Sequence, residues 1–464
     1  MALKLYNTLS RAEEVFMPRQ GLSLNEPQGE SLPVTVYACG PTVYAPVHLG
    51  NWRTFILADW LTRTLTYLGY EVKLVMNITD VDDKTISGAS GARVPLAEFT
   101  KKYEQLFIAD REALNILPPA ASPHATEFVP AMIELIEILM AKGLAYRAED
   151  GVYFLINKSE NYGKLAGNFD PEGDFVLWKF WKEEDGDVAW DSPFGRGRPG
   201  WHLECSAMIK ETLGETIDIH LGGSDLIFPH HTNEIAQSEG ANGAPLAKFW
   251  LHGGFLNIAE EKMSKSLGNI FTLADLKARV ALDSRATLAP LSYRYFLLST
   301  HYRKIANFTW EALEGAQTAY QKLLNTVADW QGLSLNEPQG ESLPVADETP
   351  RGFPSWDERF RNCLEADLNF PQALALVWEL VKDEGIAPGE KLATLLKWDE
   401  VLGLNLAAAT KTEPIPENVQ KLIAERELAR QSANFPRADE LRDKIAKLGF
   451  MVEDKTDGPR VRKA

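Results

Sequence analysis

The chain has 464 residues, 45% apolar and 24% charged, a composition typical of globular proteins. Its formal net charge of −17 argues against indiscriminate nucleic-acid binding, and no apolar run approaches the ~20 residues of a membrane-spanning helix. The 3 cysteines are too few for a disulfide framework in so long a chain. The N-terminus has no signal-peptide pattern, so we expect a cytosolic protein of about three domains.

The first part of the chain alternates between strand and helix patterns. Residues 34–38 and 71–78 are short β-branched and apolar stretches, typical of strands. Between them, residues 52–67 have apolar side chains at helical spacing, and Gly69 lies where a helix C-terminus is expected. A strand, a helix and a strand in such a short span predict a parallel sheet. Further strands are predicted at 151–156, 217–221 and 249–252.

The rest of the chain favours helices. Residues 96–146 are predicted to be mostly helical with a proline-rich break at 117–123, and helical patterns dominate from about residue 287. After Pro414 the pattern predicts a helix from Glu417, a helix around 436–448 and a strand near 450–452. The basic end, 458–463, is predicted to be a disordered arm.

These patterns predict an α/β fold of three parts. The first is a doubly wound, Rossmann-like parallel-sheet catalytic domain at 1–285, with an insertion at about 95–200. A helical bundle at 286–410 and a small C-terminal module at 411–464 follow.

One 15-residue string occurs twice, as Gln20–Val34 and as Gln331–Val345. Its glycine, proline, serine and asparagine content predicts loop structure. A string that is tolerated in two contexts need not pack against either one. We interpret it as a duplicated insertion in two surface loops without chemistry, and a shared docking motif is the alternative.

The turn after the first strand could bind an anion. It leads through His48 and Gly50 into the predicted helix, whose N-terminus offers free amides and a positive dipole. His48 adds a donor, Gly50 allows close approach, and Asn51 adds a neutral donor. The sequence contains no GxxxxGK[ST], so this is not a P-loop.

A second phosphate-binding pattern is Lys262-Met-Ser-Lys-Ser266, followed by Leu-Gly-Asn. The ammonium groups of Lys262 and Lys265 can meet phosphate oxygens as charge-assisted donors. Ser264 and Ser266 add neutral donors, and Gly268 lets the backbone bend close to a ligand. A bare KxxK is usually a solvated basic loop, and the complete pentapeptide is much rarer.

Thiols, imidazoles and carboxylates that suit a metal occur in three places. Cys39 ends the first strand, Cys205 lies in GWHLECS, and His230 and Glu234 lie in FPHHTNE. His230 and Glu234 are four residues apart and would share one face of a helix. Two thiols, one imidazole and one carboxylate suit Zn²⁺ in kind and number. Spacing alone does not separate His230 from His231.

These motifs together resemble known families. Lys262–Ser266 resembles the KMSKS signature of class I aminoacyl-tRNA synthetases, and His48–Asn51 resembles their HIGH motif, from which it departs at Leu49 and Asn51. Because Asn51 cannot become a cation, we assign it less charge stabilisation than His48 or Lys265. ACGPTVY, NITDVDDK, GWHLECSAM and DIHLGGSDLIFPHHTNEIAQSE resemble the cysteinyl-tRNA synthetase family over essentially the whole chain.

This resemblance implies an activity. L-cysteine would react with ATP to give cysteinyl-adenylate, and its transfer to the 3′ end of tRNA(Cys) would release AMP and diphosphate overall. One Zn²⁺ would be bound, Mg²⁺ would arrive with ATP, and the chain is expected to be a monomer.

The resemblance also implies site residues. The zinc ligands would be Cys39, Cys205, His230 and Glu234. The catalytic residues would be His48, Asn51, Lys262 and Lys265, and the ATP site would add Gly50, Ser264 and Ser266. Thr79, Trp201 and Asp225 would bind the amino acid, although Asp225 could instead cap the following helix.

Two other functions fit parts of these motifs. A tRNA-independent ligase that joins cysteine to an amino sugar would share the zinc and ATP motifs, but it would not need the long helical end. A degenerate, non-enzymatic homologue should have lost a zinc ligand or a KMSKS lysine, and all of these residues are present.

Overall fold

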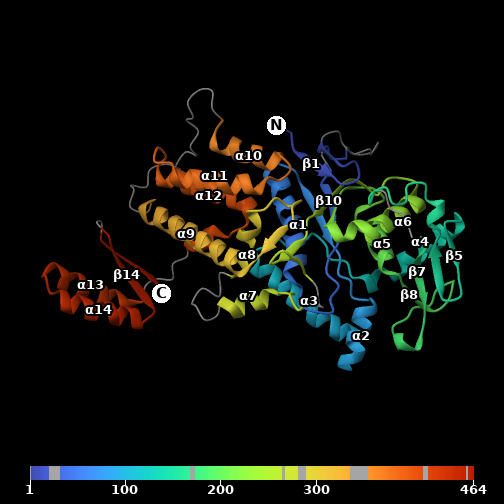
Figure 1. Ribbon diagram of the computed structural model, residues 1–464, viewed down its shortest axis with the longest axis horizontal. Helices are drawn as coiled ribbons and strands as arrows, with labels where there is room; N and C mark the ends of the chain where they lie inside the picture. Colours follow the sequence, from blue (N-terminus) through green and yellow to red (C-terminus); the bar gives the residue numbers. More distant parts are fainter. Residues whose placement is uncertain are drawn as a thin grey trace.

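The computed structural model describes residues 2–19, 32–167, 173–263, 267–280, 289–334, 354–410, 416–455 and 458–463. Figure 1 shows an elongated molecule with the insertion at one end and the C-terminal module at the other. Both copies of the duplicated string lie largely outside the described residues. The described start of the second copy continues helix α9 to Ser334, whereas the first copy ends at Val34, where strand β3 begins.

A four-stranded parallel sheet organises the first part, as predicted. Its order is β10-β9-β3-β4, with β3 at Val34–Ala38, β4 at Val72–Met76, β9 at Ile217–Gly223 and β10 at Ala247–Gly253. Every residue of β3 and β9 is buried, because helices cover both faces of such a sheet. The strands end at one edge, where ligands bind in doubly wound folds.

Helix α1 (Leu49–Tyr67) connects β3 to β4. It begins three residues before the predicted start because the His48 side chain caps it by accepting a hydrogen bond from the amide of Asn51. It ends as predicted, since Gly69 has a φ of 94°, a conformation that glycine adopts without strain.

The insertion combines helices with a second, antiparallel sheet of order β5-β6-β7-β8. Of this sheet, the sequence predicted β6 alone. Helix α2 (Asp83–Ala92) precedes the insertion, whose elements are α3 (Leu96–Ala113), α4 (Val129–Ala141), β5 (Ala145–Arg147), β6 (Gly151–Phe154), β7 (Phe175–Phe180) and β8 (Gly197–Pro199). Then α5 (Trp201–Leu213), η4 (Ser224–Leu226), η5 (Ile227–His231) and α6 (Thr232–Asn242) surround the carboxyl edge of the central sheet.

Beyond β10, a small sheet and then a helical bundle follow. The sheet joins β12 (Glu261–Lys262), β11 (Leu256–Ile258) and β13 (Ala306–Phe308). The expectation of continuous helix after residue 287 is therefore wrong at β13, a three-residue strand that pairs in parallel with β11. The helices are α7 (Leu273–Val280), α8 (Ala289–Leu298), α9 (Trp310–Ser334), α10 (Trp356–Glu365), α11 (Phe370–Lys382) and α12 (Pro388–Leu402).

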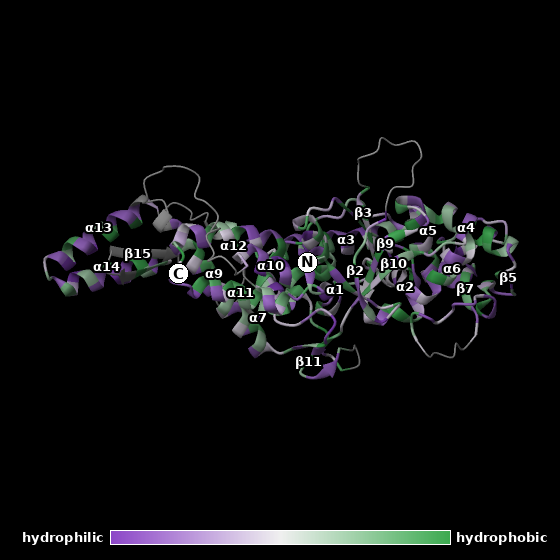
Figure 2. Cartoon of the chain, turned by 90° about the horizontal axis from the view of Figure 1, so that it is seen from above, coloured by the Kyte–Doolittle hydropathy of each residue, from purple (hydrophilic) through white to green (hydrophobic). Residues whose placement is uncertain are grey.

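The C-terminal unit contains α13 (Glu417–Gln431), α14 (Phe435–Lys447) and the hairpin β14 (Phe450–Lys455) and β15 (Gly458–Lys463). The prediction of a disordered arm at 458–463 is wrong, because β15 pairs antiparallel with β14 over its whole length. Pro459 is compatible with this hairpin because it lies near the start of an edge strand. In Figure 2, α13 and α14 are mainly hydrophilic in colour.

A buried ion pair fastens the bundle to the catalytic part. Arg294 of α8 pairs with Asp59 of α1, and both side chains are 0% exposed. Arg63 bonds the same carboxylate at 2.8 Å, and Arg294 Nε donates to the carbonyl of Leu402 at 2.8 Å. No helix in the described ranges has the length and apolar character of a membrane span.

We expect Asp59→Ala to lower the midpoint of thermal unfolding by about 6 °C or more. Removing one partner of a buried pair costs about 3–5 kcal/mol, and a large domain loses roughly 2–4 °C per kcal/mol. Calorimetry measures the midpoint. Asp110→Ala is the matched control, since Asp110 pairs with Lys277 at 3.4 Å where both side chains are partly exposed. Equal shifts in the thermal midpoint of the two variants would contradict a special stabilising role of the buried Asp59–Arg294 pair.

Candidate metal centre and active site

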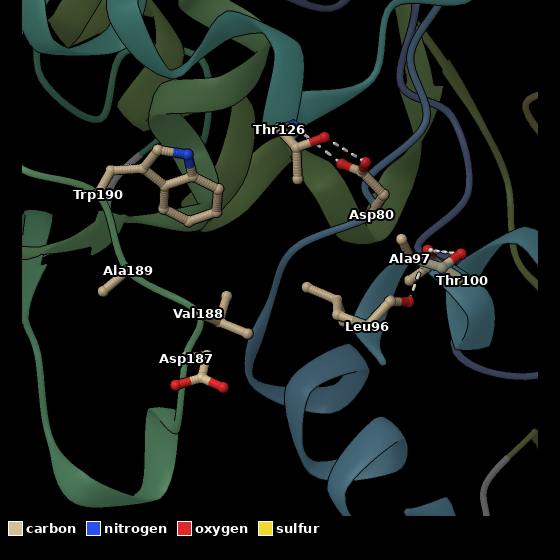
Figure 3. Close-up of a pocket in the computed structure, with 9 residues that line it drawn as sticks. All are labelled: Asp80, Leu96, Ala97, Thr100, Thr126, Asp187, Val188, Ala189 and Trp190. Atoms are coloured by element: carbon tan, nitrogen blue, oxygen red, sulfur yellow. Dashed lines mark hydrogen bonds between the residues drawn. The ribbon is translucent and has the colours of Figure 1, made fainter. Parts of the chain in front are cut away.

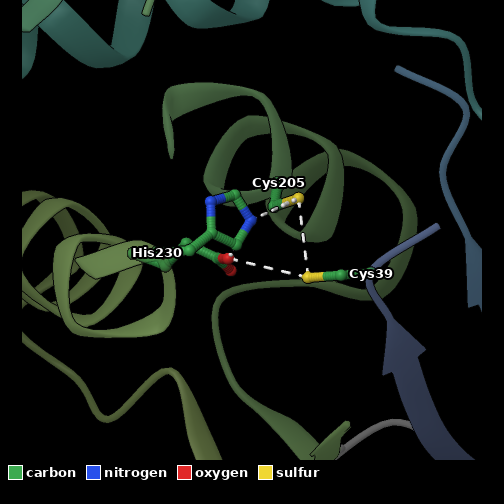
Figure 4. A group of neighbouring side chains, drawn as sticks. Cys39, Cys205 and His230 are labelled. Atoms are coloured by element: carbon green, nitrogen blue, oxygen red, sulfur yellow. Dashed lines mark hydrogen bonds and ion pairs between the residues drawn. The ribbon is translucent and has the colours of Figure 1, made fainter. Parts of the chain in front are cut away.

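Four predicted metal ligands meet at the carboxyl edge of the central sheet. Cys39 directly follows β3, Cys205 lies in α5, His230 in η5 and Glu234 in the first turn of α6. Figure 4 shows the two sulfur atoms and the His230 ring converging from these elements. All four side chains are buried, with exposed fractions between 0% and 7%.

Most separations between the donor atoms are close to those around a tetrahedral metal. Cys39 Sγ lies 3.9 Å from Cys205 Sγ and 3.8 Å from Glu234 Oε1. His230 Nε2 lies 3.6 Å from Cys205 Sγ and 2.9 Å from Glu234 Oε1. Bonds of about 2.0–2.3 Å at tetrahedral angles place zinc ligands about 3.3–3.8 Å apart. The three separations that involve sulfur lie within 0.1 Å of this range, whereas His230 and Glu234 are at hydrogen-bond distance and would have to move apart by a few tenths of an ångström around a metal. The donor set matches zinc in chemistry.

His231 remains a competitor for His230. Cys39, His220, His231 and Glu234 also form a group whose ligand atoms lie within 4.8 Å of one another. His231 Nε2 lies 3.3 Å from Cys39 Sγ. This second group omits the Cys205 thiol, however, and zinc has a strong preference for sulfur.

Other imidazoles hold the cluster in place. His220 Nε2 lies 2.7 Å from Glu234 Oε2, whereas the other oxygen of this carboxylate is the one near Cys39 and His230. His202 Nδ1 lies 2.9 Å from His230 Nδ1. Trp201 stacks on His230 with ring centroids 4.5 Å apart. Such partners fix ligand tautomers and ring orientations. His220 and His202 both lie within motifs that resemble the family, but their roles are not apparent from the sequence.

The two thiols differ in acidity. The hydrogen bond from Cys39 lowers the pKa of Cys205 to about 6, against the opposing effect of burial. Burial raises the pKa of Cys39 well above its usual value, and the adjacent Cys205 adds to that rise. For Glu234, burial favours the neutral acid, but His220 and His230 outweigh it and lower the pKa to about 2. Cys205 and Glu234 are therefore readily anionic, whereas Cys39 holds its proton more strongly.

The predicted phosphate-binding turn lies at the N-terminus of α1. His48 Nδ1 accepts from the amide of Asn51 at 3.2 Å, and Asn51 itself is exposed. A Cβ at Gly50 would lie 3.1 Å from the His48 ring, so a side chain there would press on the imidazole. In this first turn the amides of Asn51 and Leu49 are already bonded, to His48 and to the carbonyl of Phe271, so the amide of Gly50 and the positive end of the helix dipole remain for an anion.

The residues around the KMSKS-like segment contact this turn. The amide of Leu49 donates to the carbonyl of Phe271 at 2.8 Å, and His48 bridges Thr272 in antiparallel fashion. A Cβ at Gly50 would lie 3.8 Å from the methyl carbon of Met263. Lys262 is exposed in β12, with its ammonium 5.2 Å from the centre of the Phe255 ring. Ser264, Lys265 and Ser266 lie outside the described residues.

The three predicted amino-acid-binding residues have different surroundings. Thr79 is buried, and its hydroxyl donates to Glu204 at 2.9 Å and accepts from Asn77 at 3.1 Å. Trp201 is 42% exposed beside His230. Asp225 is exposed in η4, a turn without a side-chain cap. Glu204 and Asn77 are further polar groups that sequence reasoning missed, because neither is part of a recognisable ligand pattern.

A separate pocket lies where the insertion meets the catalytic part (Figure 3). Its volume is about 390 Å³, and its lining residues are Asp80, Leu96, Ala97, Thr100, Thr126, Asp187, Val188, Ala189 and Trp190. The lining holds two carboxylates and no cation, which disfavours a triphosphate. None of the predicted site residues lines it.

Comparisons with known proteins agree on one family. Residues 26–318 match the family described as tRNA synthetases class I (C) catalytic domain, and residues 412–462 match the Cysteinyl-tRNA ligase anticodon binding domain. The Cysteine–tRNA ligase of Chlamydia pneumoniae is 43% identical, covering 99% of this chain and 98% of its own. That of Methanosarcina acetivorans is 42% identical, covering 100% and 99%.

Solved structures show the same type of fold. The Mycobacterium tuberculosis methionyl-tRNA synthetase in complex with methionyl-adenylate has a TM-score of 0.60 and 18% identity. The match covers 81% of this chain and 93% of that one. At this identity the likeness concerns the fold alone.

Proposed function

The chain belongs to the cysteinyl-tRNA synthetase family, and from that membership we propose that Cys39, Cys205, His230 and Glu234 form a zinc site that selects the amino acid. The enzyme is a class I cysteine–tRNA ligase, which uses ATP to join L-cysteine to tRNA. The observation that carries the zinc proposal is the convergence of two buried thiols, an imidazole and a carboxylate within 4.8 Å.

Zinc would explain how cysteine is distinguished from serine. Cysteine has a sulfur atom where serine has an oxygen atom, and the shape of a pocket alone discriminates poorly between the two. A bound zinc would supply a sulfur-seeking Lewis acid that takes the substrate thiolate as a further ligand. Trp201, which stacks on His230, and Thr79, held by Glu204, are proposed to form the adjacent walls.

The nucleotide would bind beside this pocket. We assign its phosphates to the first turn of α1, where His48, Gly50 and Asn51 lie, and to Lys262, Ser264, Lys265 and Ser266 from the opposite side. The packing of Met263 near Gly50 supports two segments acting on one ligand. Because phosphoryl chemistry needs little covalent help from the protein, these groups would act by positioning and by neutralising charge.

Asp225 is assigned to the substrate ammonium on its charge, since it is an exposed carboxylate that does not cap its own turn. Mg²⁺ would enter with ATP. The proposed division is a catalytic domain at 1–285, a helical bundle at 286–410 that binds the anticodon stem of the tRNA, and an anticodon-binding module at 411–464. The family match at 412–462 supports the last of these. A cytoplasmic monomer is proposed for the whole chain. The tRNA-independent ligase gains no support from these relatives.

We expect cysteine-dependent ATP–pyrophosphate exchange to exceed serine-dependent exchange by at least about 10⁴-fold in kcat/KM. A site that bonds one substrate atom specifically can reach this range without an editing domain. Parallel assays with each amino acid, followed by charging of tRNA(Cys), measure it. Comparable activation of serine would refute the zinc proposal. Exchange without charging would instead point to the tRNA-independent ligase.

A further inference from the structure

Three hydrogen bonds connect the sulfur of Cys39 to the N-terminal segment. His231 Nε2 lies 3.3 Å from Cys39 Sγ, and His231 Nδ1 lies 2.8 Å from His252 Nε2. His252 Nδ1 in turn lies 2.8 Å from Thr8 Oγ1. Both imidazoles are buried, at 0% and 7% exposed, whereas Thr8 is partly exposed. Thr8 lies far from every sequence motif that carries the proposed function.

The backbone places the Thr8 hydroxyl. Thr8 follows β1 (Lys4–Asn7), which lies beside β10, the strand that carries His252 (Figure 1). The amide of Thr8 donates to the carbonyl of Trp250 at 2.9 Å. The Asn7 side chain accepts from the amide of Trp250 at 3.1 Å and donates to the carbonyl of Lys248 at 3.0 Å. The hydroxyl is therefore held against His252 by bonds that do not involve its own side chain.

The His231 ring has little freedom of its own. A Cβ at Gly222 would lie 2.6 Å from His231 Cε1, so the glycine leaves the ring the space it fills. On another side, the ring contacts Trp250 with centroids 5.3 Å apart. With its position constrained, the variable that remains is which nitrogen carries the proton.

The Cys39 sulfur determines which nitrogen of His231 carries the proton. A metal-bound thiolate can accept a hydrogen bond but cannot donate one, so a neutral His231 that bonds Cys39 must carry its proton on Nε2. His231 Nδ1 is then an acceptor, and His252 must donate to it from Nε2. His252 Nδ1 is then an acceptor as well, and it requires a donor. The Thr8 hydroxyl can supply that donor, and a side chain of the same shape without a hydroxyl cannot.

We propose that Thr8 is a positioning residue for the metal centre. Its hydroxyl fixes the tautomers of His252 and His231, so that an N–H points at the sulfur of Cys39. The inference rests on the proposed function, in which Cys39 is a metal ligand. Hydrogen bonds from partners of the ligands hold them in orientation and typically change metal affinity 10- to 100-fold. Thr8 acts on Cys39 through both His252 and His231, so its effect on metal affinity should be smaller.

We expect Thr8→Val to release zinc about 3- to 10-fold faster than the wild type. The rate is measured by transfer of metal from the full-length protein to excess chelator. The Co²⁺-loaded proteins provide a second readout, since the thiolate-to-metal charge-transfer band should shift in Thr8→Val. Thr8→Ser restores the hydroxyl and should restore both readouts. Thr62→Val is the matched control, because it removes a hydroxyl bond to the carbonyl of Ala58 within α1.

A double-mutant cycle separates this role from a general loss of structure. In the background of His252→Phe, Thr8→Val should have no further effect on metal release, because its route to Cys39 is already broken. Equal release by Thr8→Val and wild type would overturn the inference, as would an undiminished effect in the His252→Phe background. So would a fall in the thermal midpoint of metal-free Thr8→Val large enough to account for the faster release. A wild-type protein without zinc would instead refute the proposed zinc site, on which this inference rests.

Discussion

Cys205→Ser is expected to abolish tight zinc binding and to lower cysteine activation by about a thousandfold or more. Cys205 is one of two thiols in the cluster, and its pKa of about 6 makes it the more readily ionised one. Serine has almost the same shape, but its hydroxyl stays protonated at neutral pH and is a poor zinc ligand. Metal content by mass spectrometry and ATP–pyrophosphate exchange should fall together.

Cys363→Ser is the matched control for this substitution. Cys363 is also buried, at 5% exposed, but it lies in α10 within the apolar core of the bundle. The control should keep its zinc and its activity. Full zinc content in Cys205→Ser would contradict the proposed ligand set and would favour the group of Cys39, His220, His231 and Glu234.

His48→Ala is expected to slow adenylate formation by about a hundredfold while zinc content and cysteine binding stay unchanged. Since His48 Nδ1 accepts from the amide of Asn51, a neutral ring carries its proton on Nε2. That N–H is a donor at the positive end of α1, where negative charge develops on the phosphates. Removing one such donor typically costs 10²- to 10³-fold in kcat. Pre-steady-state adenylate formation measures the step directly.

A second variant separates catalysis from helix capping. Alanine removes both the donor and the N-cap, and the loss of the cap alone costs about 1 kcal/mol of stability. His48→Asp keeps a good cap but brings a negative charge and no donor. We therefore expect His48→Asp to retain thermal stability and to be at least as slow as His48→Ala. An active His48→Asp enzyme would limit His48 to capping.

The cluster of Cys39, Cys205, His230 and Glu234 was predicted from ligand chemistry and from the resemblance of its motifs, and the structure brings these four residues together. That they bind zinc stays a prediction. Cysteine is rare in this chain, and His230 and Glu234 are one helical turn apart. The partners of these ligands were not predictable in this way. His220 lies on β9, His252 on β10 and Thr8 after β1, and sequence periodicity does not say which strand lies beside which. Their roles depend on the strand order, which long-range contacts determine.

The errors in the predicted fold have a similar cause. The central strands β3 and β9 are fully buried runs, so their composition identifies them. The strands β13 and β5 have three residues each and take their conformation from pairing with neighbours. Strand β15 combines glycine, proline and charged residues, a composition that predicts disorder. It forms a strand because it pairs with β14, and its own composition does not indicate this pairing.

X-ray absorption at the zinc edge of the wild-type enzyme, with and without L-cysteine, tests the central claim most directly. The account predicts one zinc per chain, bound by two sulfur atoms and two nitrogen or oxygen atoms in the free enzyme. Addition of cysteine should raise the number of sulfur ligands to three, and addition of serine should leave it at two. A chain without zinc, or a sulfur count that cysteine does not change, would contradict the account.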